Sequence, residues 1–291
     1  MRRIPCRNRR SKANARNNDR MSVVDHMLFD SMLFDSMLFD SHSHFDAPEF
    51  DADRDAVLAR ARDAGVTRQI VPAVSAAGWP KLRGICAAEA GLYPAYGLHP
   101  MYLAEHRPEH LIELRDWIER ERPVAVGECG LDFFVEGLDA EQQSLYFDGQ
   151  LRLARDFGLP VIVHARRAVD QVMAAVRRFG PLRGVVHSFS GSADQAKRLY
   201  DLGFLIGLGG PVTYERANRL RTLAAQLPIE YLLLETDAPD QPDSGHRGQR
   251  NEPARLTTVC KTIATLRGVE PKVVAQATSA NAERLFGLTA A

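Results

Sequence analysis

Two stretches of this chain decide its fold: PVIVH at residues 160–164 and YLLLE at residues 231–235. Each is a short apolar run that ends in a histidine or an acid. Strands buried on both faces, as in parallel sheets, have such continuous apolar runs, whereas half-exposed strands alternate apolar and polar residues. The two stretches therefore predict buried parallel strands with a polar side chain at the end of each.

Short apolar runs of this kind alternate with longer amphipathic segments from residue 37 onward. The expected strands are 37–42, 68–74, 92–98, 123–128, 160–164, 183–187, 203–208 and 230–235. The expected helices are 52–64, 79–90, 108–121, 139–157, 167–178, 192–201, 215–226, 252–267 and 271–285. Eight strands alternating with helices over about 255 residues predict a (β/α)8 TIM barrel. A doubly wound open sheet is the alternative, but no G-x-G-x-x-G motif follows the first strand, so a dinucleotide-binding fold is not expected.

The N-terminal part of the chain differs from the rest. Residues 1–26 are rich in Arg and Asn and have no apolar periodicity, which predicts a disordered basic tail. The pentapeptide MLFDS then occurs three times in tandem, at 27–31, 32–36 and 37–41. Only the last copy leads into His42, so we expect residues 1–36 to lie outside the fold and residues 37–291 to form a single domain. The tail leaves two explanations open, a nucleic-acid-binding arm or an upstream start codon.

The charge of the chain is unevenly distributed although it sums to zero. The first 20 residues hold seven Arg and one Lys against one Asp, so that residues 21–291 carry a net charge of −7. This balance excludes a body that holds nucleic acid by general positive charge alone. Any polyanionic substrate would have to be held by bound metal ions and local arginines.

The composition, 45% hydrophobic and 25% charged, is that of an ordinary globular protein. No apolar stretch reaches the roughly 18 residues that span a bilayer, and no apolar segment follows the basic N-terminus as in a secretory signal. The cysteines are scattered and form no C-x-x-C pair: Cys6, Cys86, Cys129 and Cys260. These features predict a reduced, cytoplasmic protein without a membrane partner, and they leave its oligomeric state open.

Polar side chains end six of the eight expected strands. They are His42 with His44, His99, Glu128, His164, His187, and Glu235 with Asp237. Because the C-terminal ends of barrel strands meet at one mouth, these side chains should converge there. A buried Glu128 is costly unless it is paired or bound to metal. The set that suffices for two divalent ions, such as Zn²⁺, Mn²⁺ or Mg²⁺, is His42, His44, Glu128, His164, His187 and Asp237.

Each of these residues also has a plain structural explanation, because a single histidine at a strand end is more often a satisfied polar residue than a ligand. The spacing of His42 and His44 puts two imidazoles on one face of a strand, which favours a metal site. His99 is expected to contact substrate or to support the ligands, and Cys129 to be a buried, inert thiol. The histidines expected to be solvated, in the tail, helices or loops, are His26, His106, His110 and His246.

At the same strand ends, the chain resembles the TatD family of metal-dependent deoxyribonucleases, which belongs to the amidohydrolase-like barrels. The matching segments are FDSHSHFD at 39–46, GLHP at 97–100, VGECGLD at 126–132, PVIVHAR at 160–166, VHSFSG at 186–191, LETDAP at 234–239, RNEP at 250–253 and NAERLF at 281–286. The resemblance covers residues 37 to about 287. The segments around Met101 and Arg250 are similar to the YjjV-like branch of the family.

The resemblance implies a role for each matching residue. One divalent ion would be held by His42, His44 and Asp237, a second by His164 and His187, and Glu128 would bridge the two. Asp237 would also orient or deprotonate the attacking water, so Asp237 and Glu128 are the expected catalytic residues.

Three further residues are expected at the substrate: His99, Arg166 and Arg250. Arg250 either contacts a phosphate and orders its loop, or forms a bridge to Glu252 or another neighbour. Arg166 either meets a phosphate or starts the helix that follows His164.

These observations predict a two-metal hydrolase that cleaves phosphodiester bonds in nucleic-acid ends or nucleotide-like substrates. The ions would neutralise a phosphate that the acidic body otherwise repels. A hydrolase of an amide, a lactone or an aminoacyl-tRNA ester on the same metal site is the alternative, because the fold does not choose among reactions. A non-catalytic metal-binding protein is a third possibility, against which the complete ligand set argues.

Overall fold

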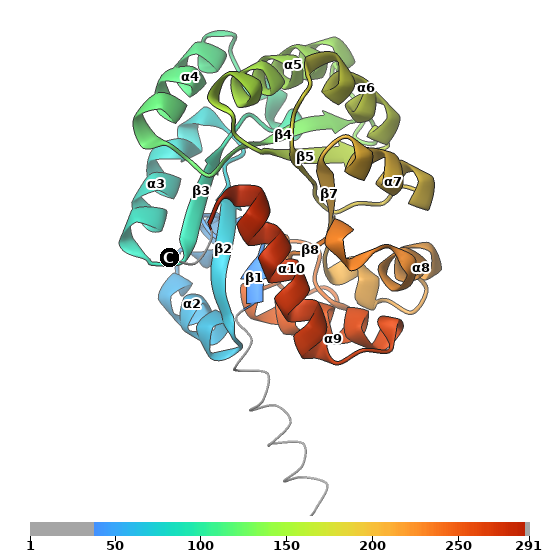
Figure 1. The fold of residues 1–291 in the computed structure, drawn as a ribbon. Coiled ribbons are helices and arrows are strands. Elements are labelled where there is room, and N and C mark those ends of the chain that lie inside the picture. The colour runs from blue at the N-terminus through green and yellow to red at the C-terminus, as the bar shows by residue number, and fades with distance from the viewer. Residues whose placement is uncertain (1–37, 289–291) are drawn as a thin grey trace, which may run out of the picture. The chain divides into compact units, whose positions relative to one another are not determined.

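The computed structural model describes residues 38–288 and shows eight parallel strands, hydrogen-bonded in the order β1 to β8, with helices around them (Figure 1). The strands are β1 (Leu38–Asp40), β2 (Val66–Pro72), β3 (Leu92–Tyr96), β4 (Ala125–Asp132), β5 (Val161–Arg166), β6 (Gly184–Val186), β7 (Phe204–Leu208) and β8 (Leu232–Leu234). The predicted (β/α)8 TIM barrel is confirmed. The expected tail and the first two MLFDS copies lie outside the described residues, and the single-domain division stays a prediction.

The helices lie close to their expected positions. The α-helices are α2 (Arg54–Asp63), α3 (Trp79–Ala88), α4 (Glu109–Glu121), α5 (Ala140–Phe157), α6 (Val169–Phe179), α7 (Ala193–Asp201), α8 (Asn218–Gln226), α9 (Leu256–Arg267) and α10 (Pro271–Phe286). The short 3-10 helices are η2 (Pro48–Phe50), η3 (Ala76–Gly78), η4 (Pro100–Glu105), η5 (Gly210–Thr213), η6 (Ile229–Tyr231), η7 (Ser244–His246) and η8 (Pro253–Arg255).

Helix α6 shows why these segments are helical. Its buried residues include Val169, Val172, Met173 and Val176, at the three- and four-residue spacing that forms one helix face. Arg177 and Arg178 lie on the exposed side. Because only one face is apolar, the helix packs that face on the strands and leaves the other in solvent.

Two strands run further than the sequence indicates. β4 continues through Glu128 to Asp132, and β5 continues through His164, because Asp132 pairs with Arg166 in parallel register. The expectation that Glu128 ends its strand is therefore wrong: it lies in the middle of β4, and the strand carries a second acid further along.

Each strand contributes one apolar side chain to a core inside the barrel. These residues are Phe39, Ile70, Ala95, Ala125, Ile162, Val185, Leu205 and Leu233. Ala282, Leu285 and Phe286 of α10 pack against this core, and Figure 1 shows α10 crossing this end of the barrel in red. Helix α10 therefore closes the end opposite to the mouth, where the polar residues gather.

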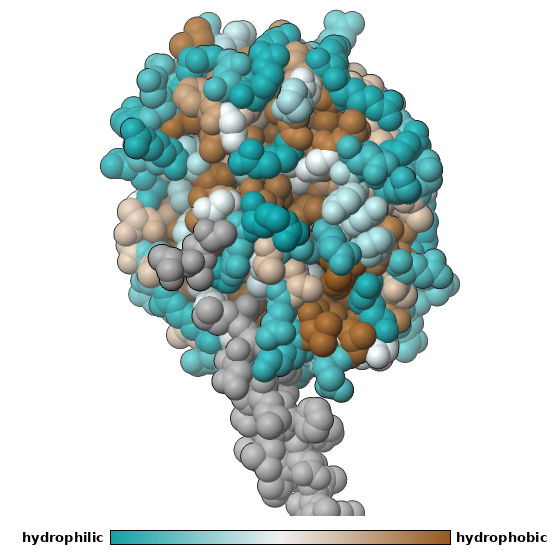
Figure 2. Space-filling model, in the orientation of Figure 1, coloured by the Kyte–Doolittle hydropathy of each residue, from teal (hydrophilic) through white to brown (hydrophobic). Residues whose placement is uncertain are grey.

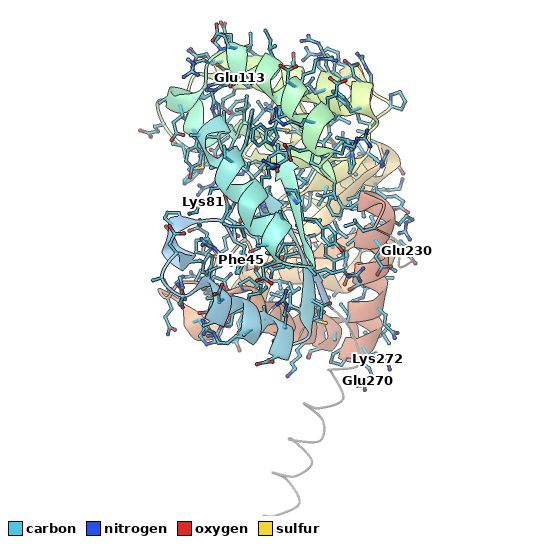
Figure 3. All side chains as sticks on the ribbon, turned by 90° about the vertical axis from the view of Figure 1, so that its left-hand side faces the viewer. Phe45, Lys81, Glu113, Glu230, Glu270 and Lys272 are labelled. Atoms are coloured by element: carbon cyan, nitrogen blue, oxygen red, sulfur yellow. The ribbon has the colours of Figure 1, made fainter. Side chains whose placement is uncertain are left out.

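The figures locate the two ends of the barrel. In the space-filling view of the end that α10 covers, hydrophilic residues occupy much of the rim and hydrophobic residues gather over α9 and α10 (Figure 2). In the view turned by 90°, Lys272 of α10 lies at the right, and Lys81, which lines the cavity described below, lies at the left (Figure 3).

The barrel closes between β8 and β1 through a buried carboxylate. Asp40 accepts hydrogen bonds from the Thr236 backbone N–H at 3.0 Å and the Thr236 hydroxyl at 2.6 Å. The Asp237 N–H then donates to the His42 carbonyl at 2.9 Å. These bonds align the end of β8 with the end of β1, so that a residue after each strand can reach the same point.

No helix among residues 38–288 is long and apolar enough to cross a membrane.

Replacing Ile162, which is 0% exposed in the barrel interior, by Ala should lower the free energy of unfolding by about 2–5 kcal/mol, because a cavity remains. Val273→Ala on the outside of α10, where the side chain is 51% exposed, should change it by less than about 0.5 kcal/mol. Urea unfolding of the two variants measures the difference. Equal midpoints would contradict a packed interior.

Candidate metal centre

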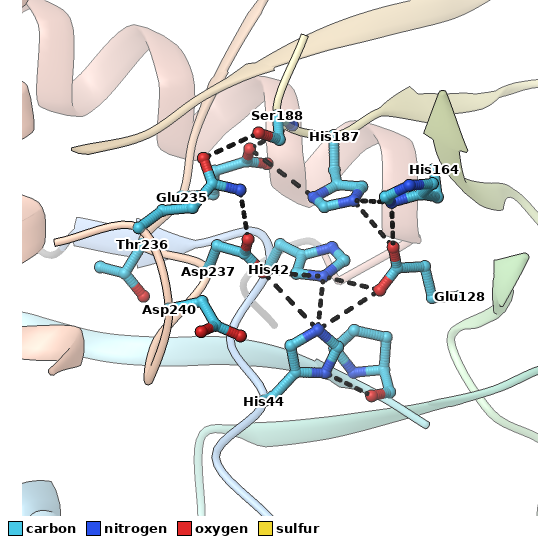
Figure 4. Close-up of polar contacts among 12 residues, drawn as sticks. His42, His44, Glu128, His164, His187, Ser188, Glu235, Thr236, Asp237 and Asp240 are labelled. Carbon is cyan, nitrogen blue, oxygen red and sulfur yellow. Dashed lines mark hydrogen bonds and ion pairs between the residues drawn. The ribbon is translucent and has the colours of Figure 1, made fainter. Parts of the chain in front are cut away.

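The structure brings the six predicted ligands into one cluster at the barrel mouth (Figure 4). His42 and His44 follow β1, Glu128 lies in β4, His164 in β5, His187 follows β6, and Asp237 follows β8. Each follows a strand, or lies near the middle of one, as Glu128 and His164 do. Convergence therefore follows from the shared direction of the strands.

The carboxylate of Glu128 lies between two pairs of histidine nitrogens. Its Oε2 is 3.1 Å from His42 Nε2 and 3.4 Å from His44 Nε2. Its Oε1 is 2.8 Å from His187 Nε2 and 3.2 Å from His164 Nδ1. Each oxygen of the carboxylate therefore faces one histidine pair.

The donor set fits divalent metal ions. The two nitrogens of each pair, His42 with His44 and His164 with His187, lie 3.3 Å apart and face one another. Asp237 Oδ1 is 3.6 Å from both nitrogens of the first pair. Several lone pairs aimed at a common point, in a buried place, are what a cation such as Zn²⁺ or Mn²⁺ requires.

Two histidines are held in the tautomer that a ligand needs. The second ring nitrogen of His44, Nδ1, lies 3.2 Å from the Pro72 carbonyl, to which it can only donate. The second ring nitrogen of His164, Nε2, lies 2.9 Å from Asp132 Oδ2. A proton on each of these atoms leaves the facing nitrogen, His44 Nε2 or His164 Nδ1, free to bind metal.

His99 lies beside Glu128 and His164, and these three residues form a further group that could hold a metal ion. Its Nδ1 accepts a hydrogen bond from the Met101 N–H at 3.1 Å, so the proton of the neutral ring is on Nε2. That N–H donates to Glu128 Oε1 at 2.9 Å. Burial lowers the pKa of His99 to about 4, against the effect of Glu128, so the ring stays neutral. The structure thus makes His99 a hydrogen-bond donor that supports Glu128; a contact with substrate stays a prediction.

The pKa values at the centre reflect burial and the charge of Glu128. Burial opposes charging of His44 and His187, but the hydrogen bonds and charge of Glu128 outweigh it and raise their pKa values to about 9 and about 10. Burial and the neighbouring His187 hold the pKa of His42 well below its usual range. For Glu128, burial is opposed by the surrounding histidines, which hold its pKa well below the ordinary value.

Three residues that contact the candidate ligands or lie beside them were given no role from the sequence. Asp132 receives the His164 proton, and its pKa is about 2, because hydrogen bonds from His164 and two backbone N–H groups outweigh its burial. Gln241 donates to Asp237 Oδ2. Glu235 accepts from the Ser188 N–H and lies 3.9 Å from His187 Nδ1. The spacing of four between Glu128 and Asp132 could have indicated one shared strand face, whereas nothing local marks Gln241.

The cluster lies in a cavity of about 960 Å³ at the barrel mouth. His44, His99, Glu128, His164, His187 and Asp237 all line it, together with two cationic side chains, Lys81 and Arg166. The guanidinium of Arg166 stacks on Phe134, 3.7 Å from the ring centroid. Arg166 is therefore held at the cavity wall, as a contact with an anionic substrate would require.

Arg250 does not line this cavity. Its guanidinium forms two hydrogen bonds with Asp53, at 2.7 and 2.8 Å, and one with Glu252 at 3.1 Å. The bridge that the sequence left as one alternative is thus present, and it ties the loop after β8 to the start of α2.

Two histidines expected to be solvated are buried. His106 is 9% exposed and shares a hydrogen bond of 2.9 Å with the His99 carbonyl. His110 is 5% exposed and lies on the inner face of α4 with Leu114 and Ile118. The expectation is wrong because the four-residue spacing from His110 to Leu114 and Ile118 places the imidazole on the packed face. His26 lies outside the described residues.

Comparison with known proteins identifies the family. The model of the TatD-related DNases matches residues 39–287, which include every ligand described above. The chain belongs to the TatD family. It is therefore a member of a family of metal-dependent hydrolases, and the resemblance that the sequence motifs indicated is confirmed.

The matches to individual relatives in the TatD family extend over almost the whole length of those proteins. The metal-dependent hydrolase YjjV of Escherichia coli is 43% identical over 250 residues, which are 85% of this chain and 96% of that protein. A protein of Erwinia billingiae named 3'-5' ssDNA/RNA exonuclease TatD is 36% identical over 83% of this chain and 96% of its own. The crystal structure of YjjV superposes with a TM-score of 0.84 over 87% of this chain and 99% of that one.

Binding of a divalent ion should release protons, because His44 and His187, with pKa values near 9 and 10, hold protons at pH 7 when no ion is bound. The affinity for Zn²⁺ should therefore rise from pH 7 to pH 9, by about tenfold per pH unit for each proton released. Calorimetric titration in buffers of different ionisation enthalpy counts the protons. An affinity that does not change over this range would contradict the raised pKa values.

Asp132→Asn should weaken metal binding by about 10- to 100-fold, because the amide no longer fixes the His164 tautomer. Competition with a chromophoric chelator measures the affinity. The matched control is Asp148→Asn, which removes a surface ion pair with Arg178 and should leave metal binding unchanged. Equal affinities of the two variants would show that Asp132 does not orient the ligand.

Proposed function

We propose that this member of the TatD family hydrolyses phosphodiester bonds, in nucleic-acid ends or nucleotide-like substrates, with two divalent ions held on either side of Glu128. The observation that carries the proposal is the position of that carboxylate, with one oxygen toward His42 and His44 and the other toward His164 and His187. A buried carboxylate between two ligand pairs is suited to bridge two ions.

Two ions in these places would supply Lewis-acid chemistry, activating water for attack and neutralising charge on the phosphate. Asp237 is the residue proposed to accept the proton of the attacking water. Without bound ions, burial raises the pKa of Asp237, against the effect of His187 and His44. Its Oδ1 lies 3.6 Å from the nitrogens of His42 and His44, beside the place where an ion would hold the water. Gln241 holds Oδ2, which leaves Oδ1 toward the ligands.

The residues around the cavity suit an anionic substrate. The guanidinium of Arg166, which lines the cavity, is proposed to contact phosphate oxygens. His99 lines the cavity as well, but its Nε2–H is donated to Glu128, so its proposed place beside the substrate is that of a neutral ring that holds Glu128 in position. Arg250 is engaged by Asp53, and we propose that it acts by ordering the loop after β8. The family match to TatD-related DNases and the exonuclease name of the Erwinia relative support a nucleic-acid substrate.

Glu128→Gln should reduce the metal-dependent release of mononucleotides from single-stranded DNA by at least about a thousandfold, because metal activation contributes several kcal/mol. The exposed residue Glu136 offers a matched control, since Glu136→Gln changes the same charge outside the cavity. Chromatography of the products measures the rate.

The phosphodiester proposal would be overturned if the wild-type protein hydrolysed no DNA, RNA or nucleotide diester but did hydrolyse amides, lactones or aminoacyl esters. That result would favour the alternative chemistry.

A further inference from the structure

A second hollow, of about 270 Å³, adjoins the cavity of the metal centre. Ser190 and Leu220 line both, so the two spaces are neighbours. Ser190 follows the ligand His187 by three residues, and three residues span at most about 10 Å. The hollow therefore lies a short distance from the place where a reacting phosphate would sit.

The hollow is basic. Arg216 and Arg219 line it, and none of its eight lining residues is acidic. Neither guanidinium forms an ion pair with a carboxylate of residues 38–288. Arg219 donates one hydrogen bond to the Ser190 carbonyl at 2.6 Å, which places its guanidinium against the β6–α7 loop. The other N–H groups of this guanidinium remain available to a ligand.

The body that surrounds the hollow is acidic, with a net charge of −7 over residues 21–291. Some surface arginines, such as Arg60 and Arg115, pair with carboxylates, whereas Arg216 and Arg219 lie next to one another in the hollow without such partners among the described residues. Two guanidiniums without such partners in one hollow favour binding of an anion. Leu220 and Leu223 in the same lining suit the apolar faces of sugars or bases.

We propose that this hollow binds the phosphodiester backbone of a single-stranded nucleic acid, next to the strand end that occupies the metal centre. Its continuity with the cavity favours successive phosphates of one chain over two separate small anions. The inference rests on the proposed function for the reacting end, but it concerns binding and can be tested without turnover.

The test measures binding of a fluorescent oligothymidylate of ten nucleotides by anisotropy, in EDTA, over a range of salt concentrations. Arg216→Gln/Arg219→Gln should weaken binding at least about tenfold, because charge-assisted hydrogen bonds to phosphate are lost. The slope of log K against log salt should fall by about 1.4, at roughly 0.7 for each phosphate contact. An unchanged affinity and slope would overturn the proposal.

The control variant is Arg177→Gln/Lys272→Gln, which removes the same charge from α6 and from α10, the helix at the end opposite to the mouth (Figure 3). It should keep the affinity and salt slope of the wild-type protein. An equal loss in this variant would show that net charge, and not the hollow, holds the strand. Thermal unfolding checks that both variants are folded.

Two further measurements separate the possible outcomes. Thymidine monophosphate and inorganic phosphate should bind the wild type and the Arg216→Gln/Arg219→Gln variant equally; an equal loss for these small anions would mean a small-anion site and overturn the proposal. Hydrolysis of bis(4-nitrophenyl) phosphate should be unchanged in that variant. If the wild type hydrolyses no phosphodiester but the variant still loses strand binding, the hollow stands and the proposed function fails.

Discussion

The candidate metal centre depends on one constraint, the burial of the Glu128 carboxylate. The side chain is 1% exposed, and a buried negative charge is unfavourable unless nearby groups compensate it. His42, His44, His164 and His187 approach its two oxygens, and His99 donates to one of them. Since these residues belong to or follow β1, β3, β5 and β6, the charge of one side chain in β4 requires that the neighbouring strands keep their register.

The barrel meets this requirement by separating its two ends. Apolar residues from all eight strands and from α10 fill the interior and close one end. At the other end, Asp40 and Thr236 join β1 to β8, which brings Asp237 beside the histidines that follow β1. The packed core holds the strands rigidly, and a rigid frame is what keeps several ligands at a fixed separation.

The candidate ligands relate to the type of reaction, whereas the surrounding surface relates to the substrate. The family match includes all six ligands, and YjjV shares the fold over almost its whole length. Metal-dependent hydrolysis follows from these shared parts. The proposed contacts with substrate involve side chains around the mouth, such as Arg166 on Phe134 and the arginine pair before and within α8. These side chains come from loops and helix starts, which a common barrel leaves free to differ.

The sequence by itself determined the number and order of the strands and predicted six candidate ligands, because apolar runs and the polar residues near their ends are local features. Only the tertiary structure decided that His99 donates to Glu128, that Asp132 and Gln241 form hydrogen bonds with His164 and Asp237, and that His106 is buried. It also showed Arg250 bound to Asp53, almost two hundred residues away in the chain. Such contacts depend on where loops lie after folding, and the distance between two loops cannot be derived from the periodicity of the sequence.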